Sequence, residues 1–260
     1  LTVALAGVLA ASMLFTGCSK KAESKVPDKL IVGTNAEFPP FEYMNDKKQP
    51  EGFDIAMIKE IGKRMGKKVE IKNMEFKSLI GAMESDSINA IIAGMTKTEK
   101  REKAVDFSDS YYTTNQAIIL KKDSKITKLA QLDGKKIGVQ EGTTGDLISS
   151  GDKFGDGKKA KVLVKGAKVK RFKKGVDAVM DLKNGSVDAV VIDELTANEF
   201  VKKNAKKLKI VIDSAGSEYY CIALTKGNTA YKEEVNKQIK AIKEDGTYDK
   251  LKAKYIDSKN

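Results

Sequence analysis

Short apolar runs alternate with amphipathic helical segments along this chain, and the same order of elements occurs twice. In the first unit, residues 29–33 have the apolar character of a buried strand, and residues 54–66 place their apolar side chains on one face of a helix that Asp54 would cap. The second unit begins at residues 136–139 and ends at the apolar strand 189–192, with another helix between them. Because strands that alternate with helices form largely parallel sheets covered on both faces, the sequence predicts two α/β units.

A sequence echo supports this division. The segment SINAII at residues 87–92 is matched by SVDAVV at residues 186–191, so a similar turn precedes a strand in each unit. A chance match of a common turn and strand pattern is the alternative, but the echo coincides with the repeated order of elements. In open α/β sheets, ligands bind beyond the carboxyl ends of the strands. We therefore expect one cleft lined by the four polar loops that follow predicted strands, at residues 34–41, 94–101, 140–145 and 193–196.

The composition excludes many kinds of active site. The chain has no histidine, which rules out Ser-His-Asp and Cys-His catalytic sites and every metal centre with a histidine ligand. We expect no metal, no cofactor and no catalytic residue. Forty-eight Lys and Arg against 36 Asp and Glu give a net charge of +12, which favours anionic partners. The lysine-rich stretch 158–174 contains a single aromatic residue, Phe172, so we interpret it as solvated strands and turns and expect no nucleic-acid partner.

The first residues have the pattern of a secretion signal. Residues 1–15 are apolar and uncharged, and a polar stretch begins directly after Cys18. This pattern resembles a bacterial lipoprotein signal, which implies a signal segment over residues 1–18, lipidation of Cys18 and a tether over residues 19–28. A buried helix that ends in a free thiol is the alternative. Lipidation of Cys18 would leave Cys221 without a disulfide partner, and we expect Cys221 to pack as a small apolar residue.

A series of fragments occurs in an order and at separations that are typical of one protein family. They are GTNAEFPPFEY at residues 33–43, GFD at 52–54, GMTKTEKR at 94–101, DFS at 106–108, LDGKKIGVQEGTT at 132–144 and GTY at 246–248. The ordered set spans nearly all of the chain beyond Cys18. It resembles the amino-acid-binding members of the bacterial extracellular solute-binding proteins (family 3), which serve ABC importers.

This resemblance implies a fold and a division into domains. The fold is the α/β type II periplasmic-binding-protein fold, in which two α/β lobes are joined by two hinge strands. Lobe 1 would be discontinuous and consist of residues 29–112 and 217–260. Lobe 2 would consist of residues 113–216, with the hinge strands at its borders.

The resemblance also implies a clamp for the two charges of a free amino acid. Arg101 matches the arginine that binds the ligand's α-carboxylate through a planar fork of donors, and Thr96 matches the hydroxyl residue beside it. Asp193, from the other lobe, matches the acid that pairs with the α-ammonium group. Alternatives remain open: Thr96 could begin a capping box with Glu99, Arg101 could form a surface ion pair with Glu99 or Glu102, and Asp193 could cap a helix.

Further positions carried over from the family complete this expected site. Gly94 and Thr144 match positions that offer backbone groups to the same zwitterion, and Thr143 would add a hydroxyl. Phe38 and Phe76 match the pair of rings that sandwiches the ligand side chain, although either ring could belong to the core.

Two residues are expected to choose the ligand side chain. Asn35 stands where many family members have aspartate, and it would suit an amide. Glu37 is an acid where others often have a neutral residue, and facing inward it would suit arginine or lysine. We therefore favour a polar or basic amino acid.

Two rival functions use the same fold. In a dehydratase-like enzyme, Glu37 or Glu141 could act as a general acid or base. A sensory ligand-binding module is the second rival. We favour an extracytoplasmic binding protein that is no enzyme, works as a monomer, delivers its ligand to an ABC permease and ATPase complex, and is held at the cell membrane by lipidated Cys18.

Overall fold

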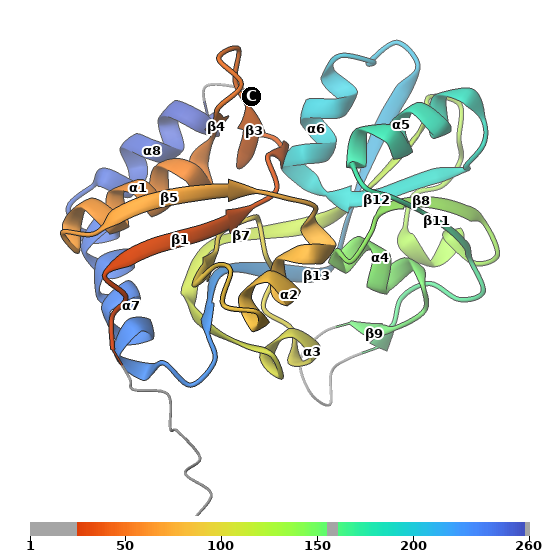
Figure 1. Cartoon of the computed structure of the whole chain (residues 1–260). Helices are drawn as coiled ribbons and strands as arrows, with labels where there is room; N and C mark the ends of the chain where they lie inside the picture. Colours follow the sequence, from red (N-terminus) through yellow and green to blue (C-terminus); the bar gives the residue numbers. More distant parts are fainter. Residues whose placement is uncertain (1–24, 155–160, 258–260) are drawn as a thin grey trace, which may run out of the picture.

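Two long strands run antiparallel to each other through the middle of the molecule (Figure 1). They are β7 (Val105–Lys121) and β13 (Leu208–Thr225). The computed structural model, which describes residues 25–154 and 161–257, places one α/β lobe on each side of this pair. Cys18 lies outside the described residues. The borders expected after residues 112 and 216 fall inside the two long strands, so these strands belong to both lobes.

Lobe 1 contributes one side of an eight-stranded sheet, whose order is β11-β8-β12-β7-β13-β6-β1-β5. Its strands β1 (Lys29–Thr34), β5 (Lys68–Asn73) and β6 (Ala90–Ile91) are parallel to one another, as predicted. The helices of this lobe are α1 (Phe53–Arg64), α2 (Leu79–Glu84), α3 (Glu99–Glu102), α7 (Thr229–Glu244) and α8 (Thr247–Tyr255), with a 3₁₀ turn at Phe76–Ser78. A small antiparallel sheet is formed by β2 (Glu37–Phe38), β3 (Glu42–Met44) and β4 (Pro50–Glu51).

Lobe 2 repeats the arrangement on the other side of β7. The strands β8 (Lys136–Gln140), β11 (Lys168–Phe172) and β12 (Ala189–Asp193) are parallel, and β12 pairs antiparallel with β7. The helices are α4 (Thr144–Ser149), α5 (Gly175–Asn184) and α6 (Glu194–Lys202), with a 3₁₀ turn at Leu129–Leu132. A short hairpin joins β9 (Lys153–Phe154) and β10 (Lys161–Val162). The predicted pair of α/β units is therefore confirmed, whereas the sheet is mixed because both long strands run against their neighbours.

The start of α1 differs from the prediction. Gly52 precedes the first turn of the helix, with a φ of 129° that side chains other than glycine rarely adopt, and a Cβ there would lie 2.2 Å from the carbonyl oxygen of Phe41. Asp54 lies inside the helix and is fully buried. It does not cap α1, because its carboxylate accepts hydrogen bonds from other elements.

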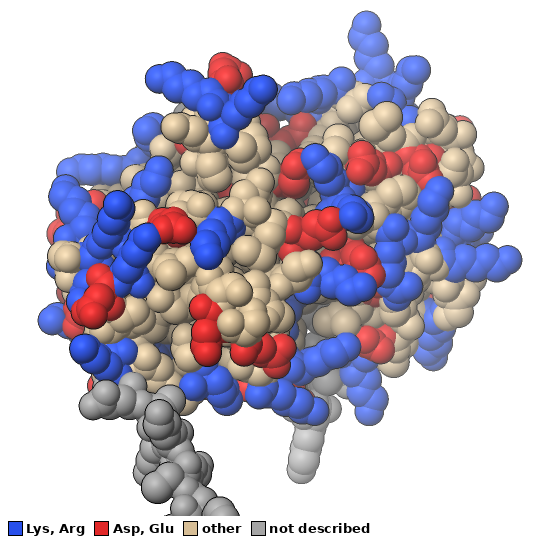
Figure 2. Space-filling model, viewed as in Figure 1, with Lys and Arg blue, Asp and Glu red and all other residues tan. Residues whose placement is uncertain are grey.

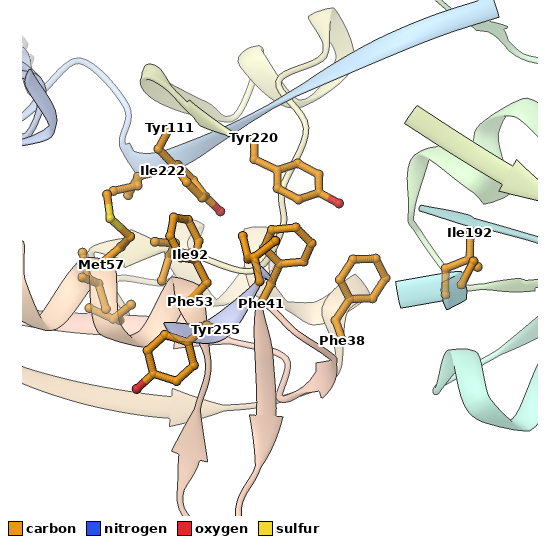
Figure 3. Close-up of a cluster of buried hydrophobic side chains, with 14 of the residues drawn as sticks. Phe38, Phe41, Phe53, Met57, Ile92, Tyr111, Ile192, Tyr220, Ile222 and Tyr255 are labelled. Carbon is orange, nitrogen blue, oxygen red and sulfur yellow. The ribbon is translucent and has the colours of Figure 1, made fainter. Parts of the chain in front are cut away.

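An aromatic cluster packs lobe 1 against the long strands (Figure 3). The Phe41 ring lies 4.9 Å from the ring of Tyr112 and 5.0 Å from the ring of Tyr220, both edge to face. Such contacts add about 0.5–1.5 kcal/mol each beyond the buried area. Cys221 packs in a second apolar cluster of lobe 1 and is a free, buried thiol, which confirms its predicted packing role.

Charged side chains cover the surface. Lys and Arg predominate on the face shown in Figure 2, but Asp and Glu are interspersed among them. Within the described residues, no helix is long and apolar enough to cross a membrane. Over the same residues, no group of three or more acidic or cysteine side chains is placed to hold a metal ion.

Candidate ligand-binding cleft

A small cavity lies between the two lobes, at the carboxyl ends of the parallel strands. All four predicted loops contribute to it, together with the turn that carries Phe76. The lining residues are Asn35, Phe38, Phe76, Ala93, Gly94, Thr96, Arg101, Gln140, Thr143, Thr144 and Asp193. The structure therefore brings together every predicted ligand residue except Glu37, and it adds Ala93 and Gln140.

Arg101 supplies a fixed positive charge on the lobe 1 side. It lies in α3, which begins after Thr98, and its side chain is buried. One guanidinium nitrogen, Nη1, donates to the Thr96 carbonyl oxygen at 2.5 Å, and Nη2 donates to the Gly142 carbonyl oxygen of lobe 2 at 3.0 Å. Burial lowers the pKa of Arg101 to about 10, so the group stays protonated at neutral pH. Its partners are neutral carbonyls, and an anionic ligand group would gain charge-assisted hydrogen bonds here.

The cation is also held by an aromatic ring. The guanidinium carbon of Arg101 lies 5.3 Å from the centre of the Phe76 ring. A cation over a ring face is attracted by about 0.5–2 kcal/mol, depending on desolvation. Phe76 therefore orients Arg101 as well as lining the cavity.

Asp193 supplies a buried acid on the lobe 2 side. It ends β12, and its carboxylate accepts hydrogen bonds from the Tyr220 hydroxyl and from Gln116 Nε2, the latter at 2.6 Å. Figure 3 shows Tyr220 pointing from the aromatic cluster toward Ile192, the residue before this acid. Asp193 precedes α6 without a side-chain capping bond. Burial, and then the charge of Glu218, raise the pKa of Asp193 well above its ordinary value, while Tyr220 and Gln116 oppose this shift.

Glu218 is a second buried acid beside the cavity, and sequence reasoning missed it. Its carboxylate accepts hydrogen bonds from Thr96 of lobe 1, from Thr144 Oγ1 of lobe 2 at 2.7 Å and from Gln116 Nε2 at 2.5 Å. Burial raises the pKa of Glu218, and these donors lower it. The acid therefore ties both lobes to β13. The only signal in the sequence is a charged residue at the start of a segment that otherwise reads as an apolar strand.

The helix caps near the cavity rule out the capping alternative for Thr96. Thr98, not Thr96, caps α3 and accepts a hydrogen bond from the Arg101 backbone N–H at 3.2 Å, so the capping box with Glu99 is wrong. Thr143 caps α4 and accepts a hydrogen bond from the Asp146 backbone N–H at 3.3 Å. Thr96 is thereby left to donate to Glu218.

Gln140 and Asn35 meet across the cavity from opposite lobes. The Gln140 side-chain nitrogen donates to Asn35 Oδ1 at 2.8 Å, and Asn35 donates to the Met74 carbonyl oxygen at 2.8 Å. The Gln140 side-chain oxygen is buried and accepts no hydrogen bond from the described residues. A buried acceptor without a donor is costly, so this atom favours a ligand with an N–H group.

Glu37 lies at the rim and not in the cavity lining. Its carboxylate forms an ion pair with Lys174 of lobe 2 at 2.7 Å, and two more pairs cross the same rim: Lys173 with Glu75 at 2.7 Å and Lys77 with Glu141 at 2.6 Å. The expectation that Glu37 faces the ligand is not met by this geometry. The rim pairs instead join lobe 1 to lobe 2.

Known proteins share both the sequence and the structure of this chain. Residues 30–258 match the family model of the bacterial extracellular solute-binding proteins, family 3. The arginine-binding extracellular protein ArtP of Bacillus subtilis (strain 168) is 33% identical over 259 residues, which cover 98% of this chain and 97% of that protein.

Solved structures of amino-acid-binding proteins are also similar to this chain. An ancestral arginine-binding protein bound to arginine is 40% identical, with a TM-score of 0.77 over 89% of this chain and 100% of its own. An ancestral arginine-binding protein bound to glutamine is 41% identical, with a TM-score of 0.78 over 89% and 99%. The ancestral amino acid-binding protein AncCDT-1, a precursor of cyclohexadienyl dehydratase, is 33% identical, with a TM-score of 0.77 over 88% and 95%. The fold is thus the type II periplasmic-binding-protein fold, and the chain belongs to the bacterial extracellular solute-binding proteins, family 3.

Proposed function

We propose that this protein is the substrate-binding component of an ABC importer and that it captures a free polar or basic amino acid between its lobes. One observation carries the proposal: a buried cation from lobe 1 and a buried acid from lobe 2, Arg101 and Asp193, line the same small cavity. A free amino acid carries both opposite charges, so it can bridge the two lobes and favour the closed state.

Each lining residue has a role in this proposal. Arg101 and Thr96 bind the α-carboxylate, and Asp193 binds the α-ammonium group. Gly94, Thr143 and Thr144 add backbone and hydroxyl groups, and Phe38 and Phe76 flank the side chain of the ligand.

The side chain of the ligand is the next step of the proposal. Asn35 and Gln140 lie in the cavity lining, and the buried side-chain oxygen of Gln140 could accept a hydrogen bond from a ligand. Arginine and glutamine both end in N–H groups, and similar proteins are described with each of them bound. We therefore favour ligands with a terminal guanidinium or amide over acidic or large apolar ones.

In this proposal, the protein binds its amino acid without catalysing a reaction. Glu37 and Glu141, the acids considered for catalysis, are outside the cavity lining and pair with lysines. The protein would act as a monomer that presents its loaded form to the permease and ATPase complex. The proposed lobes are residues 29–112 with 217–260, and residues 113–216.

A thermal-shift panel of the twenty amino acids on the chain from Ser19 tests the function. A ligand at 100 times its dissociation constant should stabilise the fold by about 2.7 kcal/mol, which raises the melting temperature by a few degrees. We expect arginine, glutamine or a similar amino acid to raise the melting temperature of the protein. No shift with any of the twenty would contradict amino-acid binding.

Replacing Glu37 with Gln should weaken arginine and glutamine binding equally and by no more than about 1 kcal/mol, because ion pairs that remain in contact with solvent contribute little. The loss should shrink at high salt, since ions screen such pairs. Titration calorimetry at two ionic strengths measures both effects. A much larger loss for arginine than for glutamine would show that Glu37 contacts the ligand.

Cys18 is proposed as a lipid attachment site that holds the protein at the outer face of the cell membrane. A Cys18→Ser variant should leave the membrane fraction, because the anchor is lost while the folded lobes are unchanged. Fractionation followed by immunoblotting measures this, with Cys221→Ser as the matched control that should stay bound. Retention of Cys18→Ser in the membrane would contradict the anchor.

A further inference from the structure

Two buried carboxyl groups lie behind the wall of the cavity. Glu42 comes from β3 and Asp54 from α1, and neither side chain has measurable exposure to solvent. Asp54 Oδ2 accepts a hydrogen bond from the Gly94 backbone N–H at 2.7 Å and another from the Tyr111 hydroxyl at 2.7 Å. Because Gly94 lines the cavity, Asp54 is separated from a bound ligand by a single peptide unit.

The backbone brings these two residues side by side, because the Asp54 N–H donates to the carbonyl oxygen of Phe41, the residue before Glu42, at 2.9 Å. Neither oxygen of Glu42, nor Oδ1 of Asp54, accepts a hydrogen bond from an N–H or hydroxyl group of the described residues. Two ionised carboxylates are both acceptors and cannot bond. A proton on one of the two carboxyls would supply the missing donor.

Among the described residues, the titratable groups that act most on the pair carry no positive charge. The titratable groups that act on the pair from neighbouring elements are Tyr111 of β7, Asp193 of β12 and Tyr248 of α8. The Tyr220 ring of β13 lies 6.3 Å from the Tyr111 ring, and Cys221 of the same strand also acts on Tyr111. None of these groups is a cation, so ionising both carboxyls would bury two uncompensated negative charges.

We propose that Glu42 and Asp54 share one proton and that this acid pair is the positioning element that holds Gly94 in the cavity wall. Glu42 carries the proton and donates a hydrogen bond to Asp54. The ionised carboxylate of Asp54 accepts the hydrogen bonds from Gly94 and Tyr111. In agreement, burial and then the neighbouring Asp54 raise the pKa of Glu42 well above its ordinary value, and burial raises the pKa of Asp54 to about 6.

The held peptide determines the geometry of the ligand site. Gly94 has a φ of 51°, in the left-handed region, and a Cβ there would lie 3.3 Å from the rings of Phe38 and Tyr220. The same loop continues to Thr96 and Arg101. Moving Gly94 would therefore displace the groups that are proposed to bind the zwitterion.

The direction of the pH effect follows from the raised pKa of Glu42. The folded state keeps this proton at a pH at which the unfolded chain has lost it. The stabilisation is therefore complete below the ordinary pKa of glutamic acid and is lost as the pH rises through the pKa of the folded state. Glu42→Gln keeps a donor toward Asp54 and cannot ionise, so its stability should lack this decline.

Infrared spectroscopy tests the proton directly. The difference spectrum between the wild type and Glu42→Gln at pH 7 should contain the C=O stretch of a protonated carboxylic acid. The difference between the wild type and Glu84→Gln, which removes an exposed acid at the end of α2, should lack it. Taking differences removes any band from Asp193, whose pKa is also raised. Glu42→Leu serves in the same way if the Gln variant does not fold, since an apolar side chain of similar size can replace a buried acid. The absence of this band from the difference spectra of both Glu42 variants would overturn the proposal.

A second measurement tests positioning. We compare the wild type with Glu42→Gln from pH 5 to pH 9, measuring the melting temperature and the dissociation constants for arginine and glutamine. Because both proteins bind the same ligand at the same pH, the titration of the ligand cancels in the comparison. For each ligand, the dissociation constant of the wild type is divided by that of Glu42→Gln. Above the Glu42 pKa, this ratio should rise with pH by up to about tenfold per unit. A constant ratio over a pH range in which the wild-type melting temperature falls relative to that of Glu42→Gln would refute the positioning role. Only this affinity measurement rests on the proposed function: a carboxyl proton and pH-dependent stability without any bound amino acid would uphold the acid pair and reject amino-acid binding.

Discussion

Replacing Arg101 with Ala should weaken amino-acid binding by about 2 to 5 kcal/mol, which corresponds to about thirtyfold to several thousandfold in the dissociation constant. The ligand's α-carboxylate would enter the closed cavity without its buried partner, and most of the penalty is this uncompensated charge. Arg101→Lys should lose less than Arg101→Ala, because it keeps the charge but not the planar fork of donors. Titration calorimetry with arginine and with glutamine measures both variants.

The matched control is Arg64→Ala. Arg64 pairs with Glu60 and Asp245 on the surface of lobe 1, outside the cavity lining. This variant should bind as the parent does, even if its melting temperature falls. The role assigned to Arg101 is wrong if Arg101→Ala folds and binds within a factor of about three of the parent, a difference below 1 kcal/mol.

Replacing Asp193 with Ala should cost a similar amount, about 2 to 5 kcal/mol, by leaving the α-ammonium group of the ligand without its acid. Asp193→Asn separates charge from shape, because the amide is nearly the same size as the carboxylate. We expect Asn to bind almost as poorly as Ala, since the lost interaction is ionic. If Asn retains parental affinity, the charge of Asp193 has no role, and Glu218 is the better candidate for the ammonium partner.

The two variants should not be additive. Both charges belong to one ligand that is held in one closed state, so once either is removed, the other contact also weakens. The double variant should therefore lose less than the sum of the single losses. Small-angle scattering should show that arginine or glutamine compacts the parent protein and not the double variant. Tight binding by the parent without compaction would contradict closure of the lobes.

Several parts of this fold could be predicted because their signals are local. The helix predicted near residues 54–66 is α1, and residues 189–192 lie in β12. Hydrophobic periodicity over a few turns decides such elements. The family resemblance then identified most of the residues that line the cavity. It could do so because motif fragments mark the loops at the ends of strands.

The sequence by itself determined the two α/β units and the loops that line the cleft, whereas the tertiary structure decided which polar groups meet there. Asp54 read as a helix cap, and Thr96 as a ligand contact or alternatively a cap, yet their side chains bond to Gly94 and to Glu218, far along the chain. Glu37 read as a ligand contact, yet Lys174 of the other lobe lies within reach. The physical reason is that periodicity and capping act within a few residues, while these partners depend on the register of β7 with β13 and on how closely the lobes approach.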